Sequence, residues 1–242
     1  MNRDYLRWYS PRLDRDMELL VFGHAGAKVL VFPTREGRFW EYERLGLVAS
    51  LSQKLEAGQL QLYCIEGLAS ETFYGFDRHP ADRIHRHEAL EDYILHEVLP
   101  LMADRNRHDC TIVHGCSLGA FQAASLVFRH PHLFRKLVAF SGRYDLTIEV
   151  ESFGNLLNGY YDSSVYFHTP MHFLPGLSDG WQLERLREVE IVLTIGRDDP
   201  FLDNNRHLSR LLADKQVGHQ LHLWDGRAHR AAEWRKMAAL YI

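Results

Sequence analysis

Short apolar segments alternate with helix-forming segments along most of the chain, and this alternation restricts the possible folds more than any other feature of the sequence. Seven segments are rich in β-branched and other apolar residues, which favours β-strands, and six of them end in glycine. The predicted strands are residues 17–23, 28–33, 61–67, 110–115, 136–142, 190–196 and 220–226.

Segments with apolar residues at helical spacing lie between these strands. The predicted helices are residues 41–58, 81–105, 118–130, 204–216 and 229–241. Apolar strands that alternate with helices indicate a mostly parallel sheet with helices on both faces. Only residues 24–27 join the first two strands, so we expect these strands to form an antiparallel hairpin at the start of the sheet.

The sequence therefore predicts a single α/β domain over residues 1–242, and its content of 46% hydrophobic residues is ample for a buried core. Residues 143–183 are the exception, because this segment is rich in aromatic residues, Gly, Ser and Asn and has no clear periodicity. A long irregular segment in a compact domain is either a pocket-covering excursion or a purely structural one.

Charge and composition exclude several classes of partner. The formal net charge is -4 and no long run of Lys and Arg occurs, which argues against nucleic-acid binding. No apolar run approaches the roughly 18 residues of a membrane span, and the N-terminal residues lack an apolar signal core. Three cysteines are an odd number, so a disulfide framework is not expected and a reduced, cytoplasmic protein is predicted.

One serine lies where the strand at residues 110–115 gives way to a helix. Ser117 is flanked by Gly115 and Gly119, which is the G-x-S-x-G pattern of a tight strand-to-helix turn. In such a turn the glycines leave room for the backbone, and the serine oxygen projects above the edge of the sheet. Ser117 is therefore a candidate nucleophile, and the N–H of Leu118 is a candidate donor to an oxyanion.

A serine nucleophile needs a base to take its proton and an acid to orient that base. Asp198 and Asp199 follow the strand at residues 190–196, and His229 follows the strand at residues 220–226. The order of serine, acid and histidine along the chain is that of an α/β-hydrolase triad, with each member after a different strand.

With these residues, the chain resembles the α/β-hydrolase superfamily and, within it, the esterase family that includes esterase D and the feruloyl esterases and is related to the mycolyltransferases. The strongest match is "HGCSLGAFQAASLVFRHPHLFRKLVAFSG" at residues 114–142. The segment "IGRDDP" resembles the acid turn of the family and selects Asp199, and "DGRAHRAAEW" resembles its histidine segment and selects His229.

The resemblance implies an α/β-hydrolase fold with a sheet of about eight strands, and a serine esterase that acts on a small-molecule ester through an acyl-enzyme. It implies neither a metal nor an organic cofactor. The alternatives are an acyltransferase that uses the same triad and a non-catalytic binding protein on this fold. The sequence does not indicate the oligomeric state.

A second oxyanion donor is expected in the loop "FPTREGRFW". Many relatives carry a His-Gly pair there, whereas this chain has Pro33 and Thr34. Aligning Pro33 with the family histidine assigns the donor to the N–H of Arg35, with that of Thr34 as the alternative.

Several other residues have competing interpretations. Tyr74, in a segment that resembles the pocket rim of the family, and Trp40 are candidate substrate-binding residues, although aromatic residues more often form core or surface packing. His85 and His87 are two residues apart on a predicted helix and do not share a face, which favours a solvated helix over a metal site. Cys116, beside Ser117, is predicted to be a packed thiol.

Overall fold

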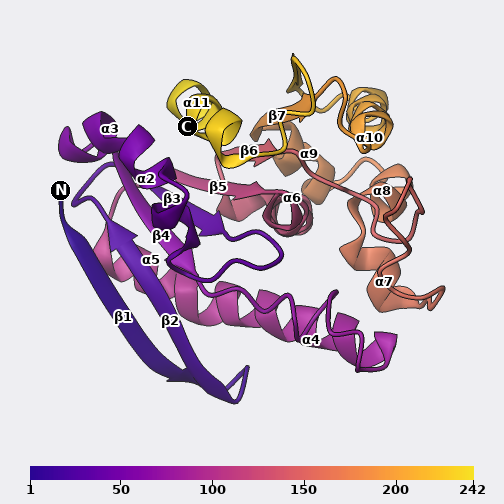
Figure 1. Cartoon of the computed structure of the whole chain (residues 1–242), viewed down its shortest axis with the longest axis horizontal. Coiled ribbons are helices and arrows are strands. Elements are labelled where there is room, and N and C mark those ends of the chain that lie inside the picture. Colours follow the sequence, from indigo (N-terminus) through magenta and orange to yellow (C-terminus); the bar gives the residue numbers. More distant parts are fainter.

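Eight strands form one sheet in the order β1-β2-β4-β3-β5-β6-β7-β8 in the computed structural model, which describes residues 1–242 (Figure 1). In this order, every neighbouring pair from β4 to β8 is parallel, which confirms the predicted mostly parallel sheet. Their bounds are β1 (Arg3–Ser10), β2 (Arg15–Phe22), β3 (Ala27–Phe32), β4 (Leu60–Ile65), β5 (Thr111–Cys116), β6 (Lys136–Phe140), β7 (Glu190–Gly196) and β8 (His219–Trp224).

The expected hairpin between residues 17–23 and 28–33 is wrong. β2 pairs antiparallel with β1 and β4, and β4 lies between β2 and β3. The hairpin is instead formed by β1 and β2, and β1 was not expected as a strand. Its side chains are mostly exposed, including Tyr5 and Tyr9, so this edge strand has no apolar run to reveal it.

Helices cover both faces of the sheet, as predicted (Figure 1). One face carries α1 (Glu41–Arg44), α2 (Leu47–Ser50), α3 (Ser52–Glu56) and α11 (Ala231–Tyr241). The other carries α4 (Pro80–Tyr93), the π-helix η1 (Ile94–Val98), α5 (Leu99–Arg105), α6 (Leu118–Arg129), α9 (Trp181–Arg187) and α10 (Leu202–Asp214). The helix expected over residues 41–58 is broken after α1, where Gly46 adopts a left-handed φ of 76°.

Residues 143–183 connect β6 to β7 and contain the short helices α7 (Ser163–His168) and α8 (Pro170–Phe173) before α9 begins. A small apolar core fixes this segment to the start of α6 and to the region before α4. This core consists of Ala69, Phe73, Ile84, Leu118, Phe121, Leu146, Leu156, Leu157 and Val165. The segment thus lies beside the predicted nucleophile.

None of the helices combines the length and the apolar character that a membrane span requires.

Candidate active site

Ser117 lies between the end of β5 and the first residue of α6, in a backbone conformation that is rare for any residue except glycine. Its φ is 57° and its ψ is -118°. Such a conformation costs on the order of 1–3 kcal/mol and persists only where the surroundings enforce it. The N–H of Ser117 donates to the carbonyl oxygen of Phe140 at 2.8 Å, so the adjacent strand helps to hold the turn.

Gly115 and Gly119 are needed at this turn because other backbone segments come very close to them. A Cβ atom on Gly115 would lie 2.2 Å from the carbonyl group of Gly119. A Cβ atom on Gly119 would lie 2.6 Å from the carbonyl oxygens of both Phe32 and Pro33. The two glycines therefore allow α6 to begin against the end of β3, and they set the distance between Ser117 and the segment that follows β3.

His229 and Asp199 meet although they follow different strands. The Nδ1 atom of His229 lies 2.8 Å from Oδ2 of Asp199, whose side chain is fully enclosed. The other carboxylate oxygen of Asp199 accepts the N–H of Phe201 at 2.9 Å. Asp198 is exposed, and its N–H donates to the carbonyl oxygen of Gly226. Asp199, rather than Asp198, is thus the partner of His229.

The loop that carries His229 is held from two sides. Gly196 at the end of β7 lies against the backbone of Arg227, where a Cβ atom would come within 2.0 Å of a carbonyl oxygen. The His229 ring packs on the indole of Trp234, with 5.5 Å between ring centroids. The indole Nε1–H of Trp234 donates in turn to Oγ of Ser141, after β6, at 3.1 Å. The sequence motifs included Ser141 and Trp234 but did not reveal this contact.

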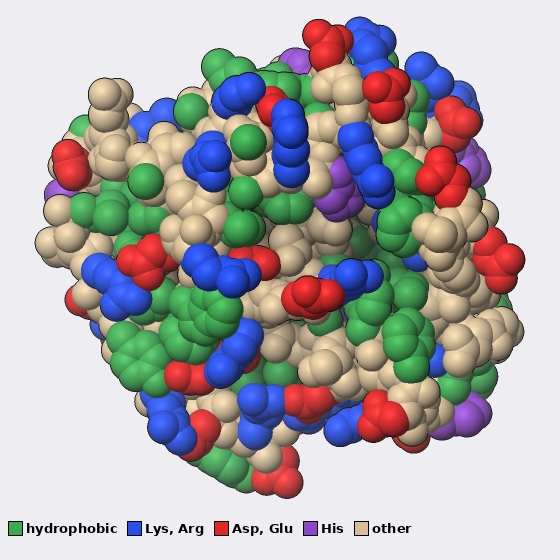
Figure 2. Space-filling model, viewed as in Figure 1, with side chains coloured by type: hydrophobic (Ala, Val, Ile, Leu, Met, Phe, Trp, Pro, Cys, Tyr) green, Lys and Arg blue, Asp and Glu red, His purple; other side chains and the backbone are tan.

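A cavity of about 310 Å³ brings most of the predicted site residues together. Ser117, Leu118, Arg35, Tyr74 and His229 all line it. Figure 2 shows a hollow on this face of the molecule, with Lys and Arg side chains on its border and hydrophobic side chains inside.

Trp40 does not line this cavity. Its ring instead lies under the guanidinium of Arg44, which does line the cavity, with Cζ of Arg44 4.8 Å from the ring centroid. Arg44 therefore lies between Trp40 and the cavity, contrary to the expected contact of Trp40 with the substrate. Trp40 occupies the N-cap of α1 and packs against the core of that sheet face.

The loop after β3 distinguishes the two candidate oxyanion donors. The N–H of Thr34 donates to Oε2 of Glu41 at 2.8 Å, and the Thr34 hydroxyl donates to Oε1 of the same carboxylate at 2.7 Å. The Thr34 amide is therefore occupied. The N–H of Arg35 has no acceptor within the protein, and the N–H of Leu118 belongs to the first turn of α6, where no intrahelical acceptor exists.

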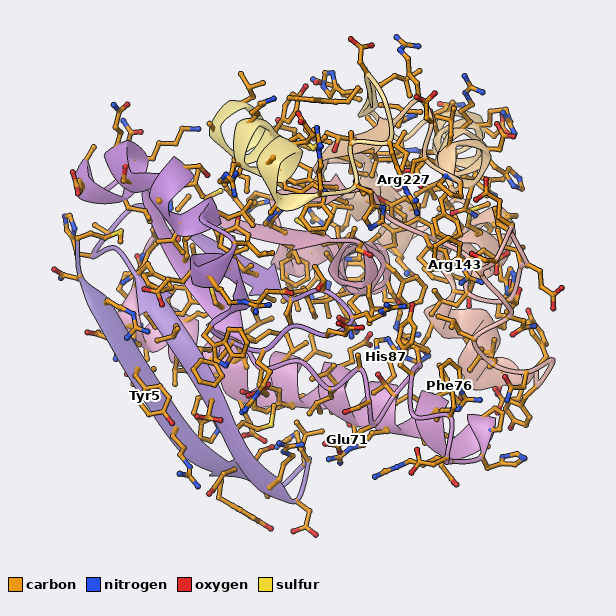
Figure 3. All side chains as sticks on the ribbon, viewed as in Figure 1. Tyr5, Glu71, Phe76, His87, Arg143 and Arg227 are labelled. Carbon is orange, nitrogen blue, oxygen red and sulfur yellow. The ribbon has the colours of Figure 1, made fainter.

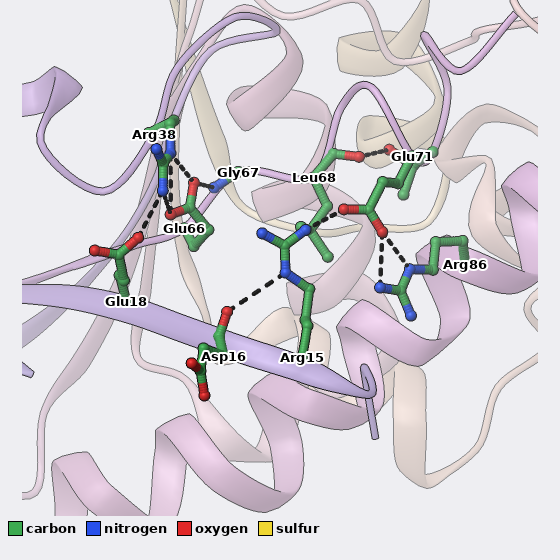
Figure 4. Close-up of polar contacts among 10 residues, drawn as sticks. Arg15, Asp16, Glu18, Arg38, Glu66, Gly67, Leu68, Glu71 and Arg86 are labelled. Atoms are coloured by element: carbon green, nitrogen blue, oxygen red, sulfur yellow. Dashed lines mark hydrogen bonds and ion pairs between the residues drawn. The ribbon is translucent and has the colours of Figure 1, made fainter. Parts of the chain in front are cut away.

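Ion pairs anchor the two segments that form one rim of the cavity (Figure 4). Arg38, in the loop after β3, pairs with the buried carboxylate of Glu66 at 2.9 Å. Glu71, in the segment that follows β4, pairs with Arg15 of β2 and with Arg86 of α4. In the same rim, Cζ of the Arg35 guanidinium lies 5.4 Å from the centroid of the Tyr74 ring.

The buried nucleophilic and basic groups next to Ser117 are unsuited to catalysis. Burial raises the pKa of the Cys116 thiol well above its usual value, so the thiol stays protonated. Burial also lowers the pKa of His114 to about 4, and Nδ1 of His114 is held 2.7 Å from the carbonyl oxygen of Val138. Both side chains act as packing groups beneath the turn.

The two histidines considered as metal ligands point to different environments. His85 is exposed and His87 is buried, so the expectation of a solvated helix holds for only one of them. No group of three or more His, Cys, Asp or Glu side chains is arranged to hold a metal ion.

Known proteins resemble this chain in sequence family and in fold. The model of a family described as "Putative esterase" matches residues 69–238, well over half of the chain. No curated protein sequence matches the chain.

Three solved structures share the fold over 99% of this chain. A ferulic acid esterase has a TM-score of 0.79 at 17% identity, with 96% of that chain covered. An S-formylglutathione hydrolase from Agrobacterium tumefaciens has a TM-score of 0.76 at 13% identity, with 92% covered. A fluorophosphonate-binding serine hydrolase from Staphylococcus aureus has a TM-score of 0.70 at 14% identity, with 96% covered.

Proposed function

The chain belongs to the putative esterase family of carboxylic ester hydrolases, and from this premise we propose that Ser117, His229 and Asp199 act as its catalytic triad. The observation that carries the proposal is the 2.8 Å contact between His229 and the enclosed carboxylate of Asp199, at a cavity that Ser117 also lines. A hydrogen bond from Nδ1–H to Asp199 leaves the lone pair of Nε2 of His229 free to act as the base.

The first half-reaction transfers the acyl group to the enzyme. Nε2 of His229 takes the hydroxyl proton of Ser117 while Oγ attacks the ester carbonyl carbon, and the carbonyl π electrons move to its oxygen. As this tetrahedral intermediate collapses, the bond to the alcohol oxygen breaks and the imidazolium of His229 protonates the departing alcohol. Asp199 stabilises the imidazolium while it exists.

The N–H groups of Leu118 and Arg35 are the donors that we assign to the oxyanion. Both residues line the cavity and neither N–H is used by a protein acceptor, whereas the N–H of Thr34 is bound to Glu41. Donors fixed before the reaction stabilise developing charge without reorganisation, and the loss of one such donor typically slows turnover by about 10² to 10³.

The second half-reaction releases the acid. His229 takes a proton from water, the resulting hydroxide oxygen attacks the acyl carbon, and the proton returns to Oγ of Ser117 as the acyl–oxygen bond breaks. His229 carries every proton in both half-reactions, so the reaction as proposed calls for no metal or organic cofactor.

The setting that we propose is the cytoplasm, with a small-molecule ester as the partner. Its support is that Cys64, Cys110 and Cys116 are all free thiols, and two of them are buried. Reduced cysteines are the rule where glutathione and thioredoxin maintain a reducing environment.

Hydrolysis of 4-nitrophenyl esters with short and medium acyl chains tests the proposal. We expect Ser117→Ala to lower kcat by about 10⁶-fold, because the remaining groups of a triad contribute little once the nucleophile is lost. A fluorophosphonate probe should label the wild-type protein and fail to label Ser117→Ala.

Ser178→Ala serves as the matched control, because Ser178 is exposed and lies outside the cavity. Equal hydrolysis by folded wild type and folded Ser117→Ala would refute the assignment of the nucleophile.

A further inference from the structure

Arginine side chains gather at the catalytic cavity of a chain whose net charge is negative. Arg35, Arg44, Arg143 and Arg227 all line the cavity, whereas the formal net charge of the chain is -4. These arginines come from the loop after β3, from α1, from the segment after β6 and from the loop after β8. Four separate parts of the chain thus direct positive charge to one site.

The two acidic residues of the lining, Glu36 and Glu41, offset only part of this charge. Glu41 is buried and its two oxygens accept both hydrogen bonds from Thr34. Glu36 is largely exposed and pairs with Arg35 at 3.1 Å. Arg44, Arg143 and Arg227 form no ion pair with any carboxylate of the protein.

Arg143 is the most unusual of the three, because it is buried. Only 7% of its surface is exposed, and its Nε and Nη2 atoms donate to the carbonyl oxygens of Asp145, Leu146, Ile148 and Gly154. Its Nη1 atom makes no hydrogen bond to the protein and is not among the fully enclosed polar atoms. The two N–H groups of Nη1 are therefore free of protein acceptors, in a residue that lines the cavity.

The state of Arg143 favours an anionic ligand. A buried charge is costly unless it is paired, and burial lowers the pKa of the Arg143 guanidinium. Carbonyl oxygens and the nearby carboxylate of Asp145 compensate only part of the cost of burying the charge. The ring of Phe201 holds the guanidinium in place, with Cζ 5.2 Å from the ring centroid. A carboxylate at Nη1 would complete the pairing in a charge-assisted hydrogen bond.

Arg227 and Arg44 extend this positive region to the mouth of the cavity. Arg227 lies two residues before His229, and its backbone is held against Gly196. The side chains of Arg143 and Arg227 lie on the same side of the molecule in Figure 3, and both line the cavity. Trp40 supports the guanidinium of Arg44 at the rim.

We propose that the ester cleaved by this enzyme carries a carboxylate group, which binds to Nη1 of Arg143 and is attracted into the cavity by Arg227 and Arg44. This inference rests on the proposed function, since it concerns the substrate of the same Ser117. Arg143 is the residue that sets the preference, and the two exposed arginines strengthen it by long-range attraction.

Two matched pairs of esters test the proposal. 4-Nitrophenyl hydrogen glutarate and 4-nitrophenyl methyl glutarate differ by a charge on the acyl side, and 4-acetoxybenzoate and its methyl ester differ by a charge on the alcohol side. We expect the charged member of at least one pair to have a kcat/KM about 10- to 100-fold higher, as a charge-assisted hydrogen bond typically contributes. The preference should weaken as the salt concentration rises.

Three variants connect that preference to the arginines. Arg143→Gln should lower the charged-to-neutral ratio to the severalfold preference that Arg227 and Arg44 still provide, and Arg227→Gln should lower the ratio severalfold. Arg210→Gln is the control, because Arg210 is exposed on α10 and does not line the cavity, and it should leave the ratio unchanged. If Arg143→Gln does not fold, the carboxylate preference is tested by Arg227→Gln and by salt, both of which should lower the charged-to-neutral ratio.

The outcomes separate the two proposals. Hydrolysis of both members of each pair at equal rates would overturn the carboxylate preference and leave ester hydrolysis standing. A preference that survives unchanged in Arg143→Gln would overturn the role of Arg143. If folded protein hydrolyses none of the four esters and takes up no fluorophosphonate at Ser117, the proposed function fails and this inference fails with it.

Discussion

At the scale of single residues, the strongest constraints on the site are steric. Ser117 keeps a backbone conformation that glycine would adopt more easily, and Gly115 and Gly119 leave no space for a side chain. The three residues lie within five consecutive positions, so these requirements leave a local signature in the sequence. For the same reason, the strained turn at Ser117 could be predicted from the sequence.

Gly119→Ala tests how far the catalytic geometry depends on this close approach. The added Cβ would lie 2.6 Å from the carbonyl oxygens of Phe32 and Pro33, and would displace the segment that carries the N–H of Arg35. We expect a loss of about 1–3 kcal/mol in the free energy of unfolding, as overpacking typically causes, and a fall in kcat of at least tenfold.

The control is Gly218→Ala, because a Cβ there meets no atom within 4 Å. Urea denaturation and 4-nitrophenyl ester kinetics on both variants provide the measurement. If Gly119→Ala matches the control in both assays, the steric role assigned to Gly119 is incorrect.

Other residues of the site could not be found from the sequence, because tertiary contacts define their roles. Arg143 belongs to a segment without periodicity, and nothing local shows that its guanidinium is buried among carbonyl oxygens. Trp40 was expected at the substrate, yet it contacts the cavity only through Arg44. The choice between Thr34 and Arg35 depended on the side chain of Glu41, which no motif identifies.

At the scale of secondary-structure elements, α4 contains a buried histidine that has no part in the proposed reaction. His87 packs against Phe73 with 4.7 Å between ring centroids, and both of its ring nitrogens lack a hydrogen-bond partner. Its pKa is lowered to about 3, mainly by burial and also by the neighbouring His168 and Arg129, while Glu91 opposes this shift. The folded protein therefore holds this side chain in the neutral form.

This histidine makes the protein less stable in acid. In the unfolded chain His87 takes up a proton near pH 6.5, whereas in the folded protein it does so only near pH 3. The unfolded state binds more protons throughout that interval, so the free energy of unfolding decreases as the pH falls from about 6.5 towards 3.

His87→Phe should reduce this loss between pH 7 and pH 4 by on the order of 3 kcal/mol. It should also stabilise the protein at pH 7 by about 1–3 kcal/mol, since it removes unpaired polar atoms from the interior. Urea denaturation at a series of pH values is the measurement, with His85→Gln as the control on the exposed face of α4. An identical pH dependence in wild type and His87→Phe would contradict the assignment.

The elements themselves were predictable where burial imposes a pattern. The seven apolar strands were expected close to their observed bounds. For the central strands the reason is that a strand buried on both faces must be apolar along its length. The edge strand β1 was not predicted, because most of its side chains are exposed. The break at Gly46 was not predicted either, because the residues around it have a helical pattern.

At the scale of the whole molecule, the sheet connects every part of the chain. Its eight strands are continuous, and the two larger cores lie on its opposite faces. We therefore propose that residues 1–242 unfold as one cooperative unit, and that residues 143–183 do not form a separate unit, because their apolar side chains belong to cores shared with α4 and α6.

Calorimetry tests this proposal. We expect a single transition with equal calorimetric and van't Hoff enthalpies, of about 170 kcal/mol near 60 °C, from about 0.7 kcal/mol for each of the 242 residues. Circular dichroism in the far and near ultraviolet should follow the same curve as the loss of esterase activity. Two resolved transitions would show that part of the chain unfolds separately.

The position of β4 between β2 and β3 has a consequence for how fast the chain folds. β3 finds its two partners only after β4 and β5 have been synthesised, and Lys28 pairs with Thr111 far along the chain. Among the strand pairs, only β1 and β2 are joined by a short turn. Loop closure must therefore precede most of the stabilising contacts, which makes folding slow and leaves apolar strand edges exposed to aggregation in the meantime. Recovery after denaturation should accordingly be greatest when the protein is most dilute.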